Sequence, residues 1–158
     1  MRVSAILEAL YRGDRDAARE AAAGAELDVL EAAAVGDTDR VRELVSADRE
    51  LVALRSADGF TALHYAAFFG TADAARVLLE YGADPGAVAQ NEMRVEPPHS
   101  AAAVAANETA RLLLDAGADP NAEQQGGFRP IDAAVQNGND ELYALLLERG
   151  AEPPAPSE

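Results

Sequence analysis

The segment LLEYGADP at residues 78–85 decides the fold, because closely related segments follow it along the chain. LLDAGADP occupies residues 113–120 and LLERGAEP occupies residues 146–153, at offsets of 35 and 33. A fixed period of about 20 to 50 residues is the signature of a repeat architecture. The sequence therefore predicts a stack of similar units.

Each of these segments has a matching partner upstream at the same offsets. TALHYAA at residues 61–67 aligns with EPPHSAA at 96–102 and with RPIDAAV at 129–135. Shorter matches extend the pattern towards the N-terminus. We expect one domain over residues 1–153, and the predicted repeats are about 1–26, 27–57, 58–90, 91–121 and 122–153.

Local signals make each unit a helix, a turn and a second helix. Thr61 can cap a first helix, while Pro97 and Pro130 fall at the first helical position. The residues predicted to cap the second helices are Asp14, Asp37, Thr71, Asn107 and Asn139. Gly82, Gly117 and Gly150 stop those helices.

Polar segments such as Ser56–Phe60 join successive pairs and are short enough for projecting β-hairpins. The predicted fold is an all-α solenoid of about five stacked helix pairs with hairpin fingers. The proline-rich residues 154–158 are expected to form a disordered tail. Both terminal pairs look like polar caps, so we expect a complete array.

Composition excludes several classes of function. The 158 residues hold no cysteine, and the 13 basic residues are all arginine, which removes thiolate and lysine chemistry. The net charge of −15 disfavours nucleic acid and anionic membrane as partners. No signal peptide or long apolar run is present, so we expect a cytoplasmic protein without a cofactor.

The string DGFTALHYAAFFG at residues 58–70, followed by LLEYGAD, resembles the ankyrin repeat with its D-G-x-T-P-L-H-x-A-A-x-x-G and L-L-x-x-G-A-D consensus. The resemblance covers residues 27–153 well. It departs from the consensus where Ala62 replaces proline, Glu96 and Arg129 replace threonine, and Asp132 replaces histidine. Arg94 also stands where a hairpin glycine is expected.

The ankyrin resemblance implies a non-catalytic module that binds a protein through finger tips and a concave groove. The residues that it places at contact positions are Phe60, Phe68, Phe69, Tyr81, Met93, Phe128, Asp58, Glu92, Gln125 and Gln136. Four of the eight aromatic residues stand at contact positions of the third unit, and aromatic side chains often anchor interfaces. Packing beneath the hairpins is the alternative role for these rings.

Catalysis and metal binding have weaker support in the sequence. The resemblance gives His64 and His99 a structural role, and no nucleophile pattern accompanies them. The acids of Gly13–Asp16 and Gly36–Asp39 fit helix caps better than metal ligands. We therefore expect neither an enzyme nor a metal site.

The uneven distribution of charge along the chain predicts the charge of the partner. Residues 1–79 hold nine arginines against fourteen acids, whereas residues 80–158 hold four against fourteen. This imbalance favours a partner with a basic surface, although solubility or salt adaptation would explain it equally well. We expect a monomer, and a regulator that binds a small molecule or a cation in an acidic groove is the alternative.

Overall fold

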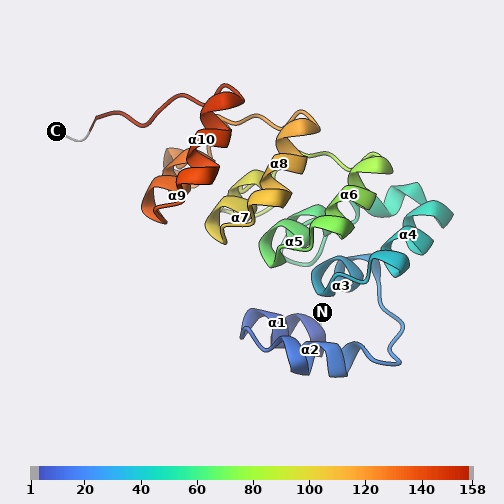
Figure 1. The fold of residues 1–158 in the computed structure, drawn as a ribbon. Helices are drawn as coiled ribbons and strands as arrows, with labels where there is room; N and C mark the ends of the chain where they lie inside the picture. Colours follow the sequence, from blue (N-terminus) through green and yellow to red (C-terminus); the bar gives the residue numbers. More distant parts are fainter. Residues whose placement is uncertain (1–3, 157–158) are drawn as a thin grey trace.

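The computed structural model describes residues 4–156, which form ten α-helices and two 3₁₀ helices (Figure 1). The first helices of the five pairs are α1 (Ala5–Tyr11), α3 (Val29–Val35), α5 (Ala62–Phe69), α7 (Pro97–Ala103) and α9 (Pro130–Gln136). The second helices are α2 (Arg15–Ala22), α4 (Thr38–Ala47), α6 (Ala72–Glu80), α8 (Asn107–Asp115) and α10 (Asp140–Glu148). The 3₁₀ helices η1 (Arg49–Ala53) and η2 (Gln125–Gly127) lie in connections. None of the helices described is long and apolar enough to cross a membrane.

The pairs stack side by side to give two layers. Helices α3, α5, α7 and α9 pack in sequence in one layer, and α4, α6, α8 and α10 pack in the other. This arrangement confirms the predicted all-α solenoid of helix pairs.

The connections before α5, α7 and α9 are called the finger loops here, at residues 55–61, 89–95 and 124–128. Each is closed by a backbone hydrogen bond: Ser56 N to Phe60 O at 2.8 Å, Ala89 N to Val95 O at 2.8 Å, and Gln124 N to Phe128 O at 2.9 Å. The predicted β-hairpins are tight loops instead. Within residues 4–156 there is no strand, and the finger loops contribute only an isolated antiparallel bridge between Arg55 and Thr61.

Most of the predicted caps of the second helices are present. Asp14 accepts a hydrogen bond from the Ala17 backbone N–H at 2.9 Å, and Asp37 accepts one from Arg40 at 3.1 Å. Asn139 accepts one from Leu142 at 3.2 Å. Such bonds satisfy N–H groups that lack a partner in the first turn.

Two predicted caps are wrong because their side chains bond to a neighbouring pair. The Thr71 hydroxyl donates to the Ala33 carbonyl at 2.6 Å and makes no cap bond. Asn107 is the first residue of α8, which Ala106 caps, and its amide pairs with that of Asn139 at 2.8 Å. These side chains link successive pairs through polar contacts.

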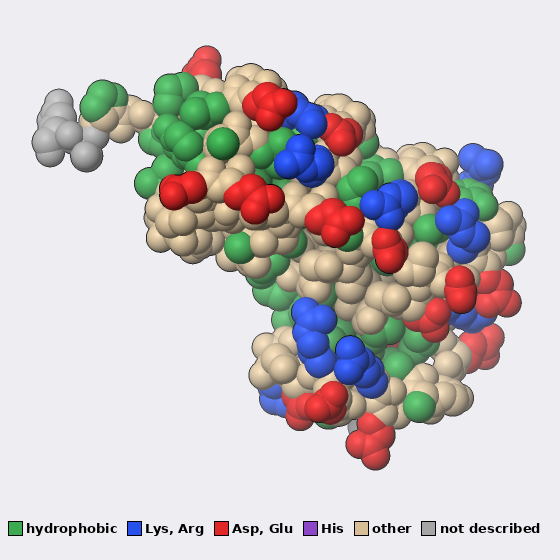
Figure 2. Space-filling model, viewed as in Figure 1, with side chains coloured by type: hydrophobic (Ala, Val, Ile, Leu, Met, Phe, Trp, Pro, Cys, Tyr) green, Lys and Arg blue, Asp and Glu red, His purple; other side chains and the backbone are tan. Residues whose placement is uncertain are grey.

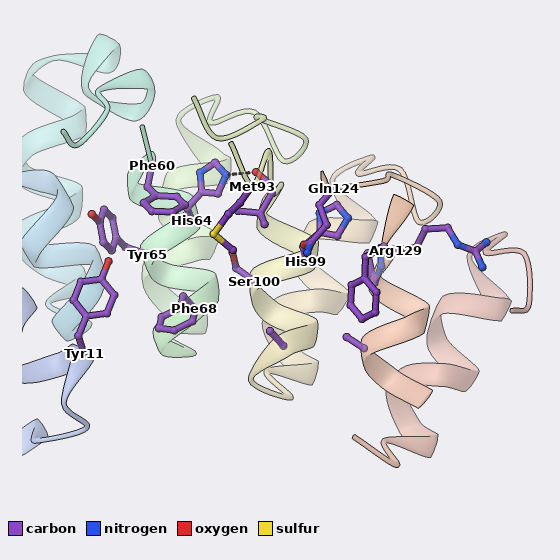
Figure 3. Close-up of a pocket in the computed structure, with 15 residues that line it drawn as sticks. Tyr11, Phe60, His64, Tyr65, Phe68, Met93, His99, Ser100, Gln124 and Arg129 are labelled. Atoms are coloured by element: carbon purple, nitrogen blue, oxygen red, sulfur yellow. Dashed lines mark hydrogen bonds between the residues drawn. The ribbon is translucent and has the colours of Figure 1, made fainter. Parts of the chain in front are cut away.

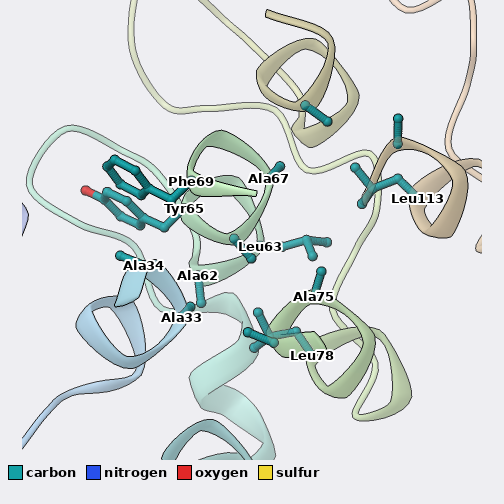
Figure 4. Close-up of a cluster of buried hydrophobic side chains, with 14 of the residues drawn as sticks. Ala33, Ala34, Ala62, Leu63, Tyr65, Ala67, Phe69, Ala75, Leu78 and Leu113 are labelled. Atoms are coloured by element: carbon teal, nitrogen blue, oxygen red, sulfur yellow. The ribbon is translucent and has the colours of Figure 1, made fainter. Parts of the chain in front are cut away.

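The core is a continuous row of aliphatic side chains between the two layers (Figure 4). Leu63, Leu78, Leu113 and Ile131 are fully buried. Alanines of α5 such as Ala66 and Ala67 are also fully buried, which lets neighbouring helices approach closely. The thin, alanine-rich core thus draws its stability from many close helix contacts.

The first helix pair reaches past its neighbour α3 to contact α5. The Tyr11 ring lies 6.2 Å from the Phe68 ring and 5.6 Å from the Phe69 ring, measured between centroids. Arg15 Nη2 donates to the Phe69 carbonyl at 3.2 Å. Because α3 presents small residues, a side chain from α1 can extend over it to the third pair.

The backbone of Glu152 still donates to Asn121, and from there the chain has no regular structure up to residue 156 (Figure 1). The last two residues of the predicted disordered tail lie outside the described residues.

Candidate binding face

An apolar pocket of about 290 Å³ lies where the finger loops meet α5, α7 and α9 (Figure 3). Aromatic rings of the third and fifth pairs line it, with Met93 between them. Tyr11 of the first pair adds a further ring. The first helices and the finger loops around this pocket are called the binding face below.

The pocket exists because the fourth pair carries small side chains where the third pair carries aromatic ones. Ser100 and Ala103 of α7 stand 35 residues after Tyr65 and Phe68 of α5. Phe128 then restores an aromatic ring on the fifth pair, 68 residues after Phe60. The smaller side chains of the fourth pair therefore leave a hollow beside the aromatic rings of the third and fifth pairs.

The side of the pocket formed by α5 is an aromatic cluster. Phe60 lies 6.0 Å from Tyr65, and Tyr65 lies 6.4 Å from Phe69, between ring centroids. Phe68 and Phe69 meet edge to face at 5.0 Å. Edge-to-face and offset packing are the arrangements that aromatic rings prefer, so this wall is rigid.

Hydrogen bonds between the finger loops fix the rim of the pocket. Gln90 N donates to Gly59 O at 3.0 Å, and the Asn91 amide donates to Asp58 O at 2.8 Å. Gln125 N donates to Met93 O at 2.9 Å. The rim is thus formed before any partner arrives, which lowers the ordering cost of binding.

Two residues of the fourth pair have a left-handed backbone at positions where the third pair has glycine. Arg94 has a φ of 53° and Ala105 a φ of 56°. The matching positions in the third pair are Gly59 and Gly70, with φ values of 84° and 70°. Arg94 follows Met93, so one strained residue adjoins the pocket.

His64 and His99 line the pocket, but their rings bond to the backbone. His64 Nε2 lies 3.0 Å from Val95 O, and its Nδ1 accepts from Thr61 N at 3.1 Å. His99 Nε2 lies 2.9 Å from Ala122 O, and its Nδ1 accepts from Glu96 N at 3.0 Å.

Both ring nitrogens of each histidine are therefore occupied, one by the backbone just before its own helix and the other by the backbone of the next connection. Burial lowers the pKa of His64 to about 4 and also lowers the pKa of His99, so both rings are neutral at pH 7. Neither ring has a nitrogen left for proton transfer to a ligand.

The floor of the binding face carries little charge. Asp132 is the charged residue of α5, α7 and α9, and it lies 3.5 Å from Arg129. Many other acids lie on the second helices, where they pair between repeats, as in Arg42–Glu80 at 3.1 Å. Figure 2 shows acidic and arginine side chains interspersed along the face in view. Within residues 4–156 no group of three His, Asp or Glu side chains could hold a metal ion.

The structure brings only part of the predicted contact set together. Phe60, Phe68, Met93 and Phe128 line the pocket. Asp58, Glu92 and Gln125 are exposed on the finger loops around it.

Three predicted contact residues lie elsewhere. Phe69 is only 8% exposed and packs against Tyr65, because consecutive helix residues point in different directions. Tyr81 ends α6 with the Arg49 guanidinium 5.1 Å from its ring centroid, away from the pocket. Gln136 is exposed at the end of α9 and does not line the pocket.

Several lining residues were absent from the predicted contact set, including Tyr11, Tyr65, Ser100 and Gln124. Ser100 could have been found by aligning the repeats, because this small residue occupies the position that Tyr65 holds in the third pair. Tyr11 has no such signal, because its contact depends on how the first pair is placed.

Comparison with known proteins agrees with this architecture. The family model for ankyrin repeats (3 copies) matches residues 6–89, which is more than half of the chain. No curated protein gives a significant match. Ankyrin repeats are in general protein-interaction modules and are typically not enzymes. With stacked helix pairs, joining finger loops and this match, the chain belongs to the ankyrin repeat family.

Proposed function

We propose that the chain is a non-catalytic module that binds a protein partner on the binding face. The apolar pocket carries this proposal, because it is a rigid hollow among the side chains of a strongly charged protein. Apolar pockets with aromatic walls are where the binding energy of an interface is usually concentrated. The bonded histidines support a role without catalysis.

A partner with a basic surface fits the charge of the chain. The net charge of −15 attracts basic molecules over long distances and raises their association rate. The uncharged floor then lets the final contact be apolar. The lack of cysteine and the acidic composition fit a monomer that works in the cytoplasm.

Affinity capture from the native cytoplasm tests the proposed function. A double variant, Phe68→Ser with Met93→Ser, removes two lining side chains that are 40% and 52% exposed. We expect it to lose the partner while keeping wild-type helical content. Phe69 is left intact, because replacing a buried ring would confuse unfolding with loss of contact.

Leu147→Ser is the matched control, since Leu147 is 38% exposed and lies on the second helix α10, outside the binding face. This variant should capture the partner as the wild type does. If the wild type, the control and the double variant all retained the partner equally, the partner would not bind at the binding face.

A small-molecule regulator is the second candidate function, and the pocket itself is the observation that favours it. Its volume is at the lower edge of the roughly 300–1,000 Å³ typical of ligand sites. A screen of metabolites by thermal shift would detect such a ligand through stabilisation of the folded state. A metabolite that raises the Tm of the wild type and leaves the Tm of Ala103→Phe unchanged would favour this candidate over a protein partner.

A further inference from the structure

The size of the apolar pocket limits what can fill it. Its volume of about 290 Å³ is nearly twice the roughly 150 Å³ of a cavity that holds one benzene ring. Drug-sized ligands occupy larger sites, of up to about 1,000 Å³. A bicyclic aromatic ring on a protein side chain matches the space.

The walls favour a flat ring over an aliphatic chain. Tyr65 and Phe68 from α5 stand on one side of the hollow (Figure 3), and Ala103 of α7 and Phe128 of the fifth pair also line it. A planar group between these rings can pack edge to face or offset against both sides. Met93 at the rim adds a polarisable sulfur, which also packs well against aromatic rings.

The polar groups of the lining select a neutral ring with a hydrogen-bond donor. The Ser100 hydroxyl and the Gln124 amide oxygen can accept a hydrogen bond. Ser100 is only 9% exposed, so an aliphatic side chain that covers it would leave the hydroxyl without water. An indole has one N–H donor and no charge, and it matches these acceptors.

The finger loops and the residues that adjoin them present more exposed acids than exposed bases. Asp58, Glu92 and Glu123 are exposed, each within two residues of a lining side chain. Arg94 is the exposed base among them, while Arg55 donates to two backbone carbonyls at 2.8 and 3.0 Å. Arg129 lines the pocket, but it lies 3.5 Å from Asp132 and donates to the Glu152 carbonyl at 3.1 Å, so its charge is partly offset. Charge complementarity therefore favours basic residues beside the inserted ring.

From this match of size, walls, acceptors and rim charge, we infer that the pocket receives a tryptophan of the partner, flanked by arginine or lysine. This inference rests on the proposed function and names the chemistry of its partner. The partner segment places the indole above Ala103, and its basic neighbours face the acids of the finger loops.

Tryptophan fluorescence gives a direct test, because the chain contains no tryptophan. The probe is the acetylated and amidated tripeptide Arg-Trp-Arg, titrated with the full chain. We expect a saturable blue shift as the indole leaves water. Arg-Leu-Arg should compete at least about tenfold less well, and Glu-Trp-Glu should bind at least about tenfold more weakly, each a difference of about 1.4 kcal/mol.

Pocket variants locate the binding. Ala103→Phe places in α7 the ring that α5 carries at Phe68, so it fills the pocket at a position where the fold already accepts phenylalanine. It should weaken binding of Arg-Trp-Arg at least about tenfold. Ser100→Ala should weaken it about two- to tenfold, as expected for one lost hydrogen bond. Leu147→Phe adds the same ring on α10, outside the binding face, and should change nothing.

Four results would overturn the inference. They are the absence of a saturable shift with the wild type, equal binding by Ala103→Phe, equal competition by Arg-Leu-Arg, and equal binding of Glu-Trp-Glu. If any of these occurs while Phe68→Ser with Met93→Ser still loses its captured partner, the proposed function stands and the tryptophan anchor is rejected.

Discussion

At the residue scale, Arg94 holds a left-handed backbone with a φ of 53° that glycine adopts more readily. A non-glycine residue in this region costs about 1–2 kcal/mol, while glycine costs about 0.5–1 kcal/mol through the entropy of the unfolded chain. We expect Arg94→Gly to raise the free energy of unfolding by about 0.5–1 kcal/mol. Urea unfolding followed by circular dichroism measures the change, and a loss of stability would contradict the strain argument.

The equivalent residue in the preceding finger loop gives the opposite prediction. Gly59 has a φ of 84°, and a Cβ placed there would lie 2.5 Å from the Gln90 carbonyl oxygen. Because that neighbour is backbone, it moves only if the finger loops separate. Gly59→Ala should lower the free energy of unfolding by more than about 2 kcal/mol in the same experiment. A neutral result would show that the finger loops are not tightly joined.

The buried ring of His64 predicts a pH dependence of stability. Its pKa is about 4 in the folded protein, against about 6.5 when unfolded, so only the unfolded state binds the proton between these values. Stability is therefore full above pH 6.5 and falls as the pH drops towards 4, by about 1.4 kcal/mol per pH unit.

The measurement is the difference in unfolding free energy between pH 7 and pH 5, for the wild type and for His64→Asn. The variant removes the titrating ring, so it should lose less stability over this interval. Equal losses in both proteins would mean that other groups control the acid response. The half-buried carboxyl of Glu96 works in the opposite direction, because partial burial raises its pKa.

At the scale of helices and loops, the first pair is attached to the array partly through Tyr11 and Arg15. Tyr11→Ala removes ring contacts with Phe68 and Phe69, and each aromatic pair contributes about 0.5–1.5 kcal/mol. We expect amides of α1 and α2 to lose protection in hydrogen exchange, while those of α6 to α10 keep it. Tyr143→Ala, at the other end of the array, should leave α1 and α2 protected. Equal loss of protection throughout the chain would show that the stack opens as one unit.

The helices were predictable because their signals are local. Asp14 and Asp37 each cap a helix by accepting a hydrogen bond from the N–H three residues later, and Pro97 is the first residue of α7. A short window of sequence is therefore enough to locate these helix starts. Thr71 and Asn107 failed as caps because their partners lie in the neighbouring pair.

The pocket was harder to predict than the fold, because it depends on residues far apart in sequence. It needs Ser100 and Ala103 to be small while Phe68 and Phe128 are large. The repeats align these positions, but only a stacked arrangement makes the difference in size a cavity. The burial of Phe69 likewise follows from the contact made by Tyr11, which no local pattern contains.

At the scale of the whole molecule, the two layers divide packing and charge. The layer of first helices has almost no charged residues, so it can present apolar groups to a partner. The second helices carry many of the acids and pair some of them between repeats, as in Arg76–Glu108 at 3.5 Å. This division lets one chain be strongly acidic while its first helices carry almost no charge.

The same net charge predicts opposite effects of salt on stability and on binding. A charge of −15 repels itself in the compact state, and exposed ion pairs offset little of that repulsion. Raising the ionic strength from about 0.01 M to about 0.15 M shortens the screening length from about 30 Å to about 8 Å. The urea midpoint should therefore rise, whereas the association rate with a basic partner should fall.

Stopped-flow binding and equilibrium unfolding measured in the same buffers separate the two effects. A urea midpoint that falls with salt would mean that the inter-repeat ion pairs outweigh the repulsion. An association rate that does not depend on salt would show that the acidic charge does not contribute to recognition of the partner.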